Sequence, residues 1–207
     1  MSIVRCGALV LTTVLVAITA WAQDAATVQD ILTKLRAGGH VIVVRHGATH
    51  ADQADTDPLN LDSVAKQRQL NDKGRADARA FGEVLKQSGV PIGKVYSSRF
   101  QRAVETARLI GGKDPETTND VTEGGQVVSP NENARRMQAL RAMAGRVPEA
   151  GTNTLIVTHK PNILDAFGKD WFEVREGEAS VFRPDGGGHT LVARVQAADW
   201  GKLAGAE

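Results

Sequence analysis

The chain has 207 residues, of which 42% are hydrophobic and 24% are charged. This composition is that of an ordinary globular domain and excludes a disordered or repetitive chain. The 25 basic and 24 acidic residues nearly balance, so a polyanion-binding surface is not indicated and no nucleic-acid partner is expected.

The first 22 residues are predicted to be a secretory signal peptide. Arg5 precedes an almost wholly apolar stretch over residues 7–20 that is too short to span a bilayer, and Ala20-Trp21-Ala22 offers an A-x-A cleavage site. Cleavage there would leave a single domain over residues 23–207, without a membrane span, in the periplasm or outside the cell. It would also remove Cys6, the only cysteine, and with it any disulfide, zinc-thiolate site or cysteine nucleophile.

The mature part begins with a helix predicted over residues 25–36, where apolar residues recur at helical spacing. The next segment, Val41-Ile42-Val43-Val44, is an apolar run typical of a parallel strand buried on both faces. Arg45-His46-Gly47 follows directly. Because parallel sheets bind ligands at the carboxyl ends of their strands, Arg45 and His46 are candidate site residues, and Gly47 is expected to allow a sharp turn and the close approach of a ligand.

Residues 48–70 are polar and irregular, and a loop of this length in a compact domain is usually functional or mobile. Its acidic residues, among them Asp52, Asp55 and Asp57, lack the spacing of a calcium loop, so we interpret them as solvated. A helix over 73–87, capped by Asn71-Asp72, a strand over 92–96 and a helix over 100–110 come next.

The last third of the chain repeats the strand pattern. A helix is predicted over 131–144, followed by the strand 154–158, which ends on His159, and by a helix from Pro161 to Phe167. Apolar segments over 179–182 and 190–195 flank a glycine-rich turn and predict a hairpin that adds edge strands. The alternation predicts an α/β fold, a three-layer α/β/α sandwich with a mostly parallel central sheet. Two strands of one sheet that both end on a histidine strengthen the case for a site.

Three motifs in this order resemble the histidine phosphatase superfamily, also called the phosphoglycerate mutase-like family. They are Arg45-His46-Gly47, then the segment Ser97-Ser98-Arg99-Phe100-Gln101-Arg102 with the following Ala-x-x-Thr-Ala element, and Thr158-His159. The resemblance runs from about residue 40 to 159. It implies the phosphoglycerate mutase-like fold and a phosphatase of the mutase-like branch.

The resemblance implies that His46 is a nucleophile that forms a phosphohistidine, with one ring N–H held by an acceptor such as a backbone carbonyl. Arg45, Arg102 and His159 would bind the phosphoryl oxygens, and these positioned cations would stabilise the developing charge without a metal or another cofactor. Arg99 competes with Arg102, but Arg102 matches the family position, and Arg99 is expected at the rim.

The leaving group needs a proton, and the resemblance implies a glutamate between the second motif and the last histidine as its donor. Glu123 is the candidate and Glu176 the reserve. A carboxyl group near a phosphate dianion should have a raised pKa, which would let it hold a proton near neutral pH. The alternative is that Glu123 is a turn residue beside two glycines.

Three positions depart from the family pattern: Ala48 stands where many relatives have glutamate, and Lys160 and Pro161 follow His159. Lys160 could face a substrate or remain solvated, and the sequence after His159 argues against a phytase. With a signal peptide present, we expect hydrolysis of a small phosphomonoester or a cell-envelope phosphate rather than a mutase reaction. The oligomeric state is not readable from the sequence.

Two alternatives stay open. The first is a phosphate-binding or interaction module that keeps the fold but has little or no turnover. The second is a metal hydrolase that uses the histidines at positions 40, 46, 50 and 159.

Overall fold

The computed structural model describes residues 28–124 and 128–204. The predicted signal peptide over residues 1–22 lies outside these ranges, so its cleavage and the domain boundary at residue 23 stay predictions. None of the helices in the described ranges is long and apolar enough to cross a membrane.

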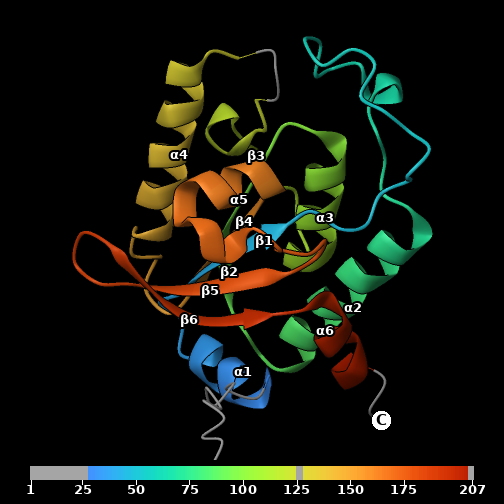
Figure 1. Ribbon diagram of the computed structural model, residues 1–207. Helices are drawn as coiled ribbons and strands as arrows, with labels where there is room; N and C mark the ends of the chain where they lie inside the picture. Colours follow the sequence, from blue (N-terminus) through green and yellow to red (C-terminus); the bar gives the residue numbers. More distant parts are fainter. Residues whose placement is uncertain (1–27, 125–127, 205–207) are drawn as a thin grey trace, which may run out of the picture.

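Within the described residues, six strands form one sheet. They are β1 (Val41–Arg45), β2 (Ile92–Ser97), β3 (Glu116–Thr117), β4 (Asn153–Thr158), β5 (Ala179–Pro184) and β6 (His189–Val195). Their order is β3-β2-β4-β1-β5-β6 (Figure 1). The pairs β1–β4, β2–β4 and β2–β3 are parallel, whereas β5 is antiparallel to both β1 and β6. The C-terminal hairpin therefore extends a parallel sheet, as predicted.

The helices cover both faces of this sheet. The described part holds α1 (Val28–Arg36), α2 (Asp72–Gln87), α3 (Gln101–Gly111), α4 (Pro130–Ala144), α5 (Lys160–Phe167) and α6 (Ala197–Ala204), with short 3-10 helices over Val64–Lys66, Asn119–Val121 and Lys169–Trp171. In Figure 1, α4 and α5 lie on one side of the sheet and α2, α3 and α6 on the other.

Two apolar clusters separate these layers, because alternate residues of each strand point to opposite faces. Ile42 and Val44 of β1 pack in a cluster with α1, α2, α3 and α6, whereas Val41 and Val43 pack with α4, α5 and the third 3-10 helix. The fold is thus the three-layer α/β/α sandwich that the sequence predicts.

Most elements begin and end close to their predicted positions. The side chain of Asn71 accepts a hydrogen bond from Gly74 N at the start of α2, as expected for its N-cap. Residues 48–70 are irregular except for one 3-10 turn, and an isolated bridge between Thr49 and Leu70 closes their base. Two elements were not predicted, the two-residue strand β3 and the helix α6.

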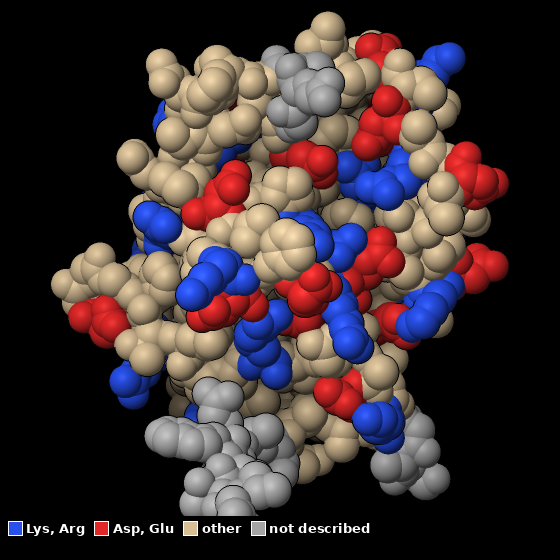
Figure 2. Space-filling view, viewed as in Figure 1, with Lys and Arg blue, Asp and Glu red and all other residues tan. Residues whose placement is uncertain are grey.

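On the face shown in Figure 2, basic and acidic side chains are intermingled, and neither sign covers a large continuous area. The charge on this side of the molecule is therefore mixed, in line with the near-equal totals of the sequence.

Candidate active site

The candidate site lies where β2, β4 and β1, adjacent in the sheet, end at the same edge. Arg45 ends β1 and His46 follows it, Thr158 ends β4 and His159 follows it, and Ser97 ends β2. The helices α3 and α5 begin just after β2 and β4, so their N-termini, which favour anions, lie at this edge as well. The topology therefore brings the three sequence motifs together.

His46 is held in one orientation. Its side chain is only 2% exposed. Its Nδ1 lies 2.8 Å from the carbonyl oxygen of Gly47, and because a carbonyl can only accept, Nδ1 carries the proton and Nε2 keeps a free lone pair. Burial, followed by the nearby His159, lowers the pKa of His46 well below its usual value. His46 is thus neutral at neutral pH, with the tautomer that a nucleophile needs, and the backbone acceptor is the one the sequence predicted.

The backbone around His46 is fixed from several sides. Its N–H donates to Thr158 O at 2.9 Å, and its carbonyl accepts from Gly177 N at 3.1 Å. Gly47 N donates to the hydroxyl of Thr106, the threonine of the Ala-x-x-Thr-Ala element, at 3.0 Å. The position of His46 therefore depends on β4, on α3 and on the segment before β5.

The role expected of Gly47 needs correction. Its φ angle is not positive, so the turn does not require glycine. Instead, a Cβ at Gly47 would lie 2.9 Å from the carbonyl oxygen of Gly74, and a Cβ at Gly74 would lie 2.1 Å from that of Ala48. The two glycines allow the turn after His46 to pack directly against the start of α2.

Arg45 faces the site beside the reserve acid. Its NH1 donates to Val174 O at 2.8 Å, and its NH2 lies 3.5 Å from Oε1 of Glu176. Burial lowers the pKa of Arg45, Glu176 opposes this effect and the charge of Arg68 adds to it, so Arg68 also lies near the site. The arginine stays charged throughout, because its ordinary pKa lies so far above neutrality.

Arg102 is buried and Arg99 is not, which agrees with the choice made from the sequence. The Arg102 side chain is 1% exposed and lies over the ring of Phe100, whereas the Arg99 side chain is 38% exposed and pairs with the exposed Asp62. NH1 of Arg102 donates to Oδ1 of Asp55 at 3.0 Å. The prediction that Asp55 is a solvated loop carboxylate is therefore wrong, because the 48–70 loop folds back over α3.

Glu123 and His159 complete the arrangement. Oε2 of Glu123 accepts from NH2 of Arg102 at 3.4 Å and lies 3.1 Å from Nδ1 of His159, although the latter pair is not aligned as a hydrogen bond. Nε2 of His159 is 2.7 Å from the hydroxyl of Ser98. Both candidate acids thus border the site, Glu123 on the Arg102 side and Glu176 on the Arg45 side.

The pKa of Glu123 departs from its ordinary value in the direction opposite to the one expected. Contact with His159 lowers it most, burial opposes this effect and the charge of Arg102 adds to the lowering, giving a pKa of about 2. Burial lowers the pKa of His159. In the protein without a ligand, Glu123 is therefore an anion and His159 is neutral at neutral pH.

The three predicted phosphate ligands share one feature. Nε of Arg45 and Nε of Arg102 are buried and have no hydrogen-bond partner, and Nδ1 of His159 has only the misaligned Glu123 carboxylate at 3.1 Å. Buried nitrogens of this kind are nearly always paired in folded proteins, so their concentration in three neighbouring side chains calls for an acceptor. The oxygens of a tetrahedral oxyanion would supply such acceptors.

Ser98 was not assigned a role from the sequence, yet it contacts the ring of His159 and is completely buried. Its position directly after β2, on the edge shared with His159, is the signal that could have identified it. Nζ of Lys160 lies 5.0 Å from the centre of the exposed Phe172 ring, and both roles expected of this lysine stay predictions.

The four histidines of the metal-hydrolase alternative do not all lie in one place. His40 precedes β1 and His46 follows it, so they lie at opposite ends of that strand. In residues 28–124 and 128–204, no three His, Cys, Asp or Glu side chains are placed to hold a metal ion together.

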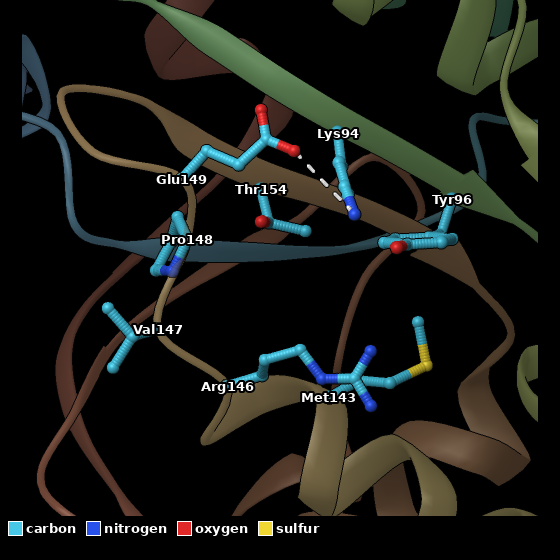
Figure 3. A pocket seen from close by; sticks show the side chains of 8 residues that line it. All are labelled: Lys94, Tyr96, Met143, Arg146, Val147, Pro148, Glu149 and Thr154. Carbon is cyan, nitrogen blue, oxygen red and sulfur yellow. Dashed lines mark ion pairs between the residues drawn. The ribbon is translucent and has the colours of Figure 1, made fainter.

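A second hollow lies away from these residues. The pocket in Figure 3, about 60 Å³ in volume, is lined by side chains that include Lys94, Tyr96, Arg146 and Thr154. Lys94 there pairs with Glu149 at 3.6 Å (Figure 3). Thr154 lies near the start of β4, whereas His159 follows its end, so this pocket is at the opposite edge of the sheet from the histidines.

The fold and the site together define an α/β protein whose two strand-terminal histidines and two arginines surround a position suited to a phosphoryl group. The model of the histidine phosphatase superfamily (branch 1) matches residues 41–127, and its structural relatives share the fold. Residues 41–127, which hold the first two motifs, are thus similar to the histidine phosphatase superfamily.

Its curated relatives match over short segments. A 2,3-bisphosphoglycerate-dependent phosphoglycerate mutase of Bartonella tribocorum is 37% identical over 73 residues, 35% of this chain and 33% of the relative. The mitochondrial serine/threonine-protein phosphatase Pgam5 of Drosophila grimshawi is 39% identical over 71 residues, 34% of this chain and 22% of the relative. The match thus spans a third or less of the length of these relatives, which include both a mutase and a phosphatase.

The similarity to solved structures covers more of the chain. The protein histidine phosphatase SixA complexed with tungstate has a TM-score of 0.55 at 21% identity, covering 77% of this chain and 98% of that one. A mycobacterial glucosyl-3-phosphoglycerate phosphatase has a TM-score of 0.53 at 17% identity, covering 75% and 98%. At these identities the likeness concerns the fold.

Proposed function

We propose that the protein is a phosphomonoester hydrolase that works through a phosphohistidine on His46, without a metal ion and outside the cytoplasm. One observation carries the proposal. The neutral, buried His46 presents an unprotonated Nε2 beside three side chains that each keep a buried nitrogen without a hydrogen-bond partner. A nucleophile and an incomplete set of anion ligands thus share one edge of the sheet.

In the first step, Nε2 of His46 attacks the phosphorus atom while the bond to the leaving oxygen breaks. Arg45, Arg102 and His159 bind the three non-bridging oxygens, on which charge spreads during the transfer. The carbonyl of Gly47, which accepts from Nδ1, stabilises the positive charge that develops on the ring. The product is a phosphohistidine and an alkoxide that must take up a proton.

Glu123 is the proposed proton donor, but it is ionised in the free protein, so its proton must arrive with the substrate. A phosphomonoester monoanion carries one, because the second pKa of a phosphomonoester is about 6. Transfer of that proton to Glu123 and from there to the leaving oxygen balances the first step. In the second step, water attacks the phosphohistidine, the P–N bond breaks and the Glu123 carboxylate takes the proton of the water.

This route predicts an acid-shifted pH profile. The value of kcat/KM should fall above about pH 6 as the substrate loses its proton. On the acid side, kcat/KM should begin to fall only well below pH 6.5, because burial keeps His46 neutral down to that range. Glu176 pairs with Arg45 rather than with His159, so it is the weaker candidate for the donor.

Location and substrate rest on the sequence. The signal peptide predicted over residues 1–22 supports action in the periplasm or outside the cell, where a small phosphomonoester or a phosphate group of the cell envelope would be the substrate. Expression of the full chain in a bacterium and the mass of the purified protein test the location. A mature N-terminus at Gln23 in the extracytoplasmic fraction supports it, and an intact chain in the cytoplasm contradicts it.

The activity is tested by incubating the purified protein with a panel of phosphomonoesters, with and without a chelator. We expect phosphate release that the chelator does not change, an acid-labile phosphoprotein after rapid quenching, and loss of both in His46→Ala. Glu123→Gln should lower kcat by about 10²-fold, and Glu176→Gln by less.

Phosphate release that does not depend on His46, or none from any ester, would overturn the proposal. If the protein still bound phosphate in the second case, the alternative of an inactive binding module would hold. Transfer of the phosphoryl group to a second hydroxyl instead of to water would identify a mutase.

A further inference from the structure

Asp55, which belongs to no motif, contacts a predicted phosphate ligand directly. Its Oδ1 accepts from NH1 of Arg102 at 3.0 Å and from the backbone N–H of Arg68 at 3.0 Å. The Arg102 side chain is almost completely buried and that of Asp55 is mostly buried. A charged contact this well shielded from water is stronger than a surface pair.

The loop that carries Asp55 is fastened to one short stretch of the body. Besides the Asp55–Arg102 pair, Asp62 pairs with Arg99 at 3.1 Å, and the side chain of Gln67 accepts from Gln101 N at 2.7 Å. All three contacts reach residues 99–102, where α3 begins.

The loop is also bonded within itself. Thr56 N donates to Lys66 O at 2.8 Å, and Gln69 N donates to the side chain of Gln53 at 2.9 Å. Its two halves are thus joined, so the Asp55 carboxylate can leave Arg102 together with the loop.

A carboxylate and a phosphoryl group compete for Arg102. Both are anions that bind the N–H groups of a guanidinium. In the free protein NH1 of Arg102 donates to Asp55 and NH2 donates to Glu123, which leaves only Nε unpaired, so a phosphoryl group that binds the guanidinium through two nitrogens must replace one carboxylate. An anionic phosphoryl group added beside both carboxylates would be repelled by each. Glu123 is needed in the site as proton donor, whereas Asp55 has no step in the reaction.

We propose that Asp55 holds the phosphate position of Arg102 in the free protein and is displaced when a phosphoryl group binds. This inference rests on the proposed function, because it takes Arg102 as a phosphate ligand. The displacement sets a threshold: anions that bind weakly, such as carboxylates, do not displace Asp55, whereas a phosphomonoester does. Asp55 is therefore a specificity-determining residue, and the 48–70 loop moves away from α3 as substrate enters.

The test uses two tetrahedral oxyanions of nearly the same shape, tungstate with charge −2 and perrhenate with charge −1, and needs no turnover. Their dissociation constants are measured by calorimetry for the wild-type protein, Asp55→Asn and the control Asp52→Asn. Asp52 lies exposed in the same loop, so its variant has the same change of charge without the contact. Unfolding curves confirm that each variant is folded.

The outcomes separate three roles of Asp55. If Asp55 is displaced, each ligand must break the same Asp55–Arg102 contact in the wild type, and neither must break it in Asp55→Asn. The substitution then lowers both dissociation constants by one common factor of about tenfold. If Asp55 stayed in place and only repelled the ligand, tungstate would gain more than perrhenate. If it positioned Arg102, both affinities would fall. Either of the last two results, or no change, overturns the proposal, and Asp52→Asn should leave both constants nearly unchanged.

Hydrogen exchange gives an independent readout. The backbone N–H of Gln101 donates to the side chain of Gln67 across the contact between the loop and α3, so its exchange should become faster when the loop moves away as tungstate binds to the wild type. Unchanged or slower exchange at Gln101 in the complex would overturn the displacement. Absence of tungstate binding in wild type and in Asp55→Asn would also overturn it, whereas the proposed function itself is decided separately by His46-dependent phosphate release.

Discussion

Two clusters of carboxylate and arginine, each with one fully buried member, flank the end of β1, and they differ in how completely their polar atoms are paired. Glu178, which precedes β5, is buried and accepts from Arg194, from Gln196 Nε2 at 2.6 Å and from Arg175 N at 3.1 Å. Its two oxygens are thus engaged by several donors. The cluster of Arg102, Glu123 and His159 has charges of the same kind but keeps two buried nitrogens without a hydrogen-bond partner.

The difference in pairing indicates that the first cluster stabilises the fold and that the second is a binding site. A fully paired buried carboxylate fixes the elements around it, in this case β6 against the start of β5. An incompletely paired cluster lowers stability unless a ligand completes it, so it is the kind of local inconsistency expected at a binding site. The two clusters should therefore respond to mutation in opposite ways.

The largest expected effect is on activity at the incompletely paired cluster. Arg102→Gln should lower kcat/KM by about 10³-fold or more, because the planar guanidinium that stabilises the transferring phosphoryl group is lost. The neighbouring Arg99→Gln is the matched control and should change kcat/KM by less than about tenfold, since its guanidinium is exposed at the rim. Equal losses in the two variants, measured by steady-state kinetics, would place the phosphate ligand elsewhere.

The next largest effect is on stability at the fully paired cluster. Glu178→Gln removes the counter-charge of the half-buried Arg194 and weakens the hydrogen bonds that the buried carboxylate accepts, so it should lower the free energy of unfolding by about 2 kcal/mol. Activity per folded molecule, measured well below the melting temperature, should change less than threefold. Urea denaturation measures the loss, with the exposed Glu173→Gln as the control that should change little. The loss of activity per folded molecule can be expressed as a rise in activation free energy. If this rise exceeds the loss in free energy of unfolding, the two clusters act as one unit.

The smallest expected effect is a decrease in stability at mildly acid pH. Burial lowers the pKa of both His46 and His159 in the folded protein, so the unfolded chain binds protons first as the pH falls through about 6.5. Stability is then fully present above that pH and should fall by roughly 1.5 kcal/mol in total between pH 7.5 and 6. Urea midpoints measured across this range check the sign, and His46→Gln or His159→Gln should each remove part of the slope. A stability that rises toward pH 6 would contradict the assignment.

Regular apolar periodicity made most elements predictable from the sequence. The helix expected over residues 73–87 begins one residue earlier and ends as predicted, and β1 follows its apolar run. The strand β3 has two residues and leaves too short a pattern to detect. Helix α6 depends on a distant contact, because Trp200 is fully buried by stacking on Phe81 of α2 at 4.1 Å.

Within the site, the sequence identified the residues that local pattern places at strand ends and missed those brought in by the loop. His46 and His159 follow apolar runs, which made their common edge predictable. Asp55 lies 47 positions before Arg102 in an irregular segment. Such a segment has no periodic pattern from which its path over the body of the protein could be predicted. The ionisation of Glu123 could not be predicted either, since it depends on its contacts with His159 and Arg102.

The N–H of Gly177, which donates to the carbonyls of both Arg45 and His46, has a practical consequence for anyone who trims or grafts this protein. A fragment cut to the family match over residues 41–127 would retain His46 and Arg102. It would lack β4, which supplies the acceptor for the His46 N–H, and the Gly177 donor on the other side of the turn. The orientation of His46 thus depends on the completed sheet. A graft of the motif alone would carry the residues of the motif without the backbone hydrogen bonds that hold His46 in place.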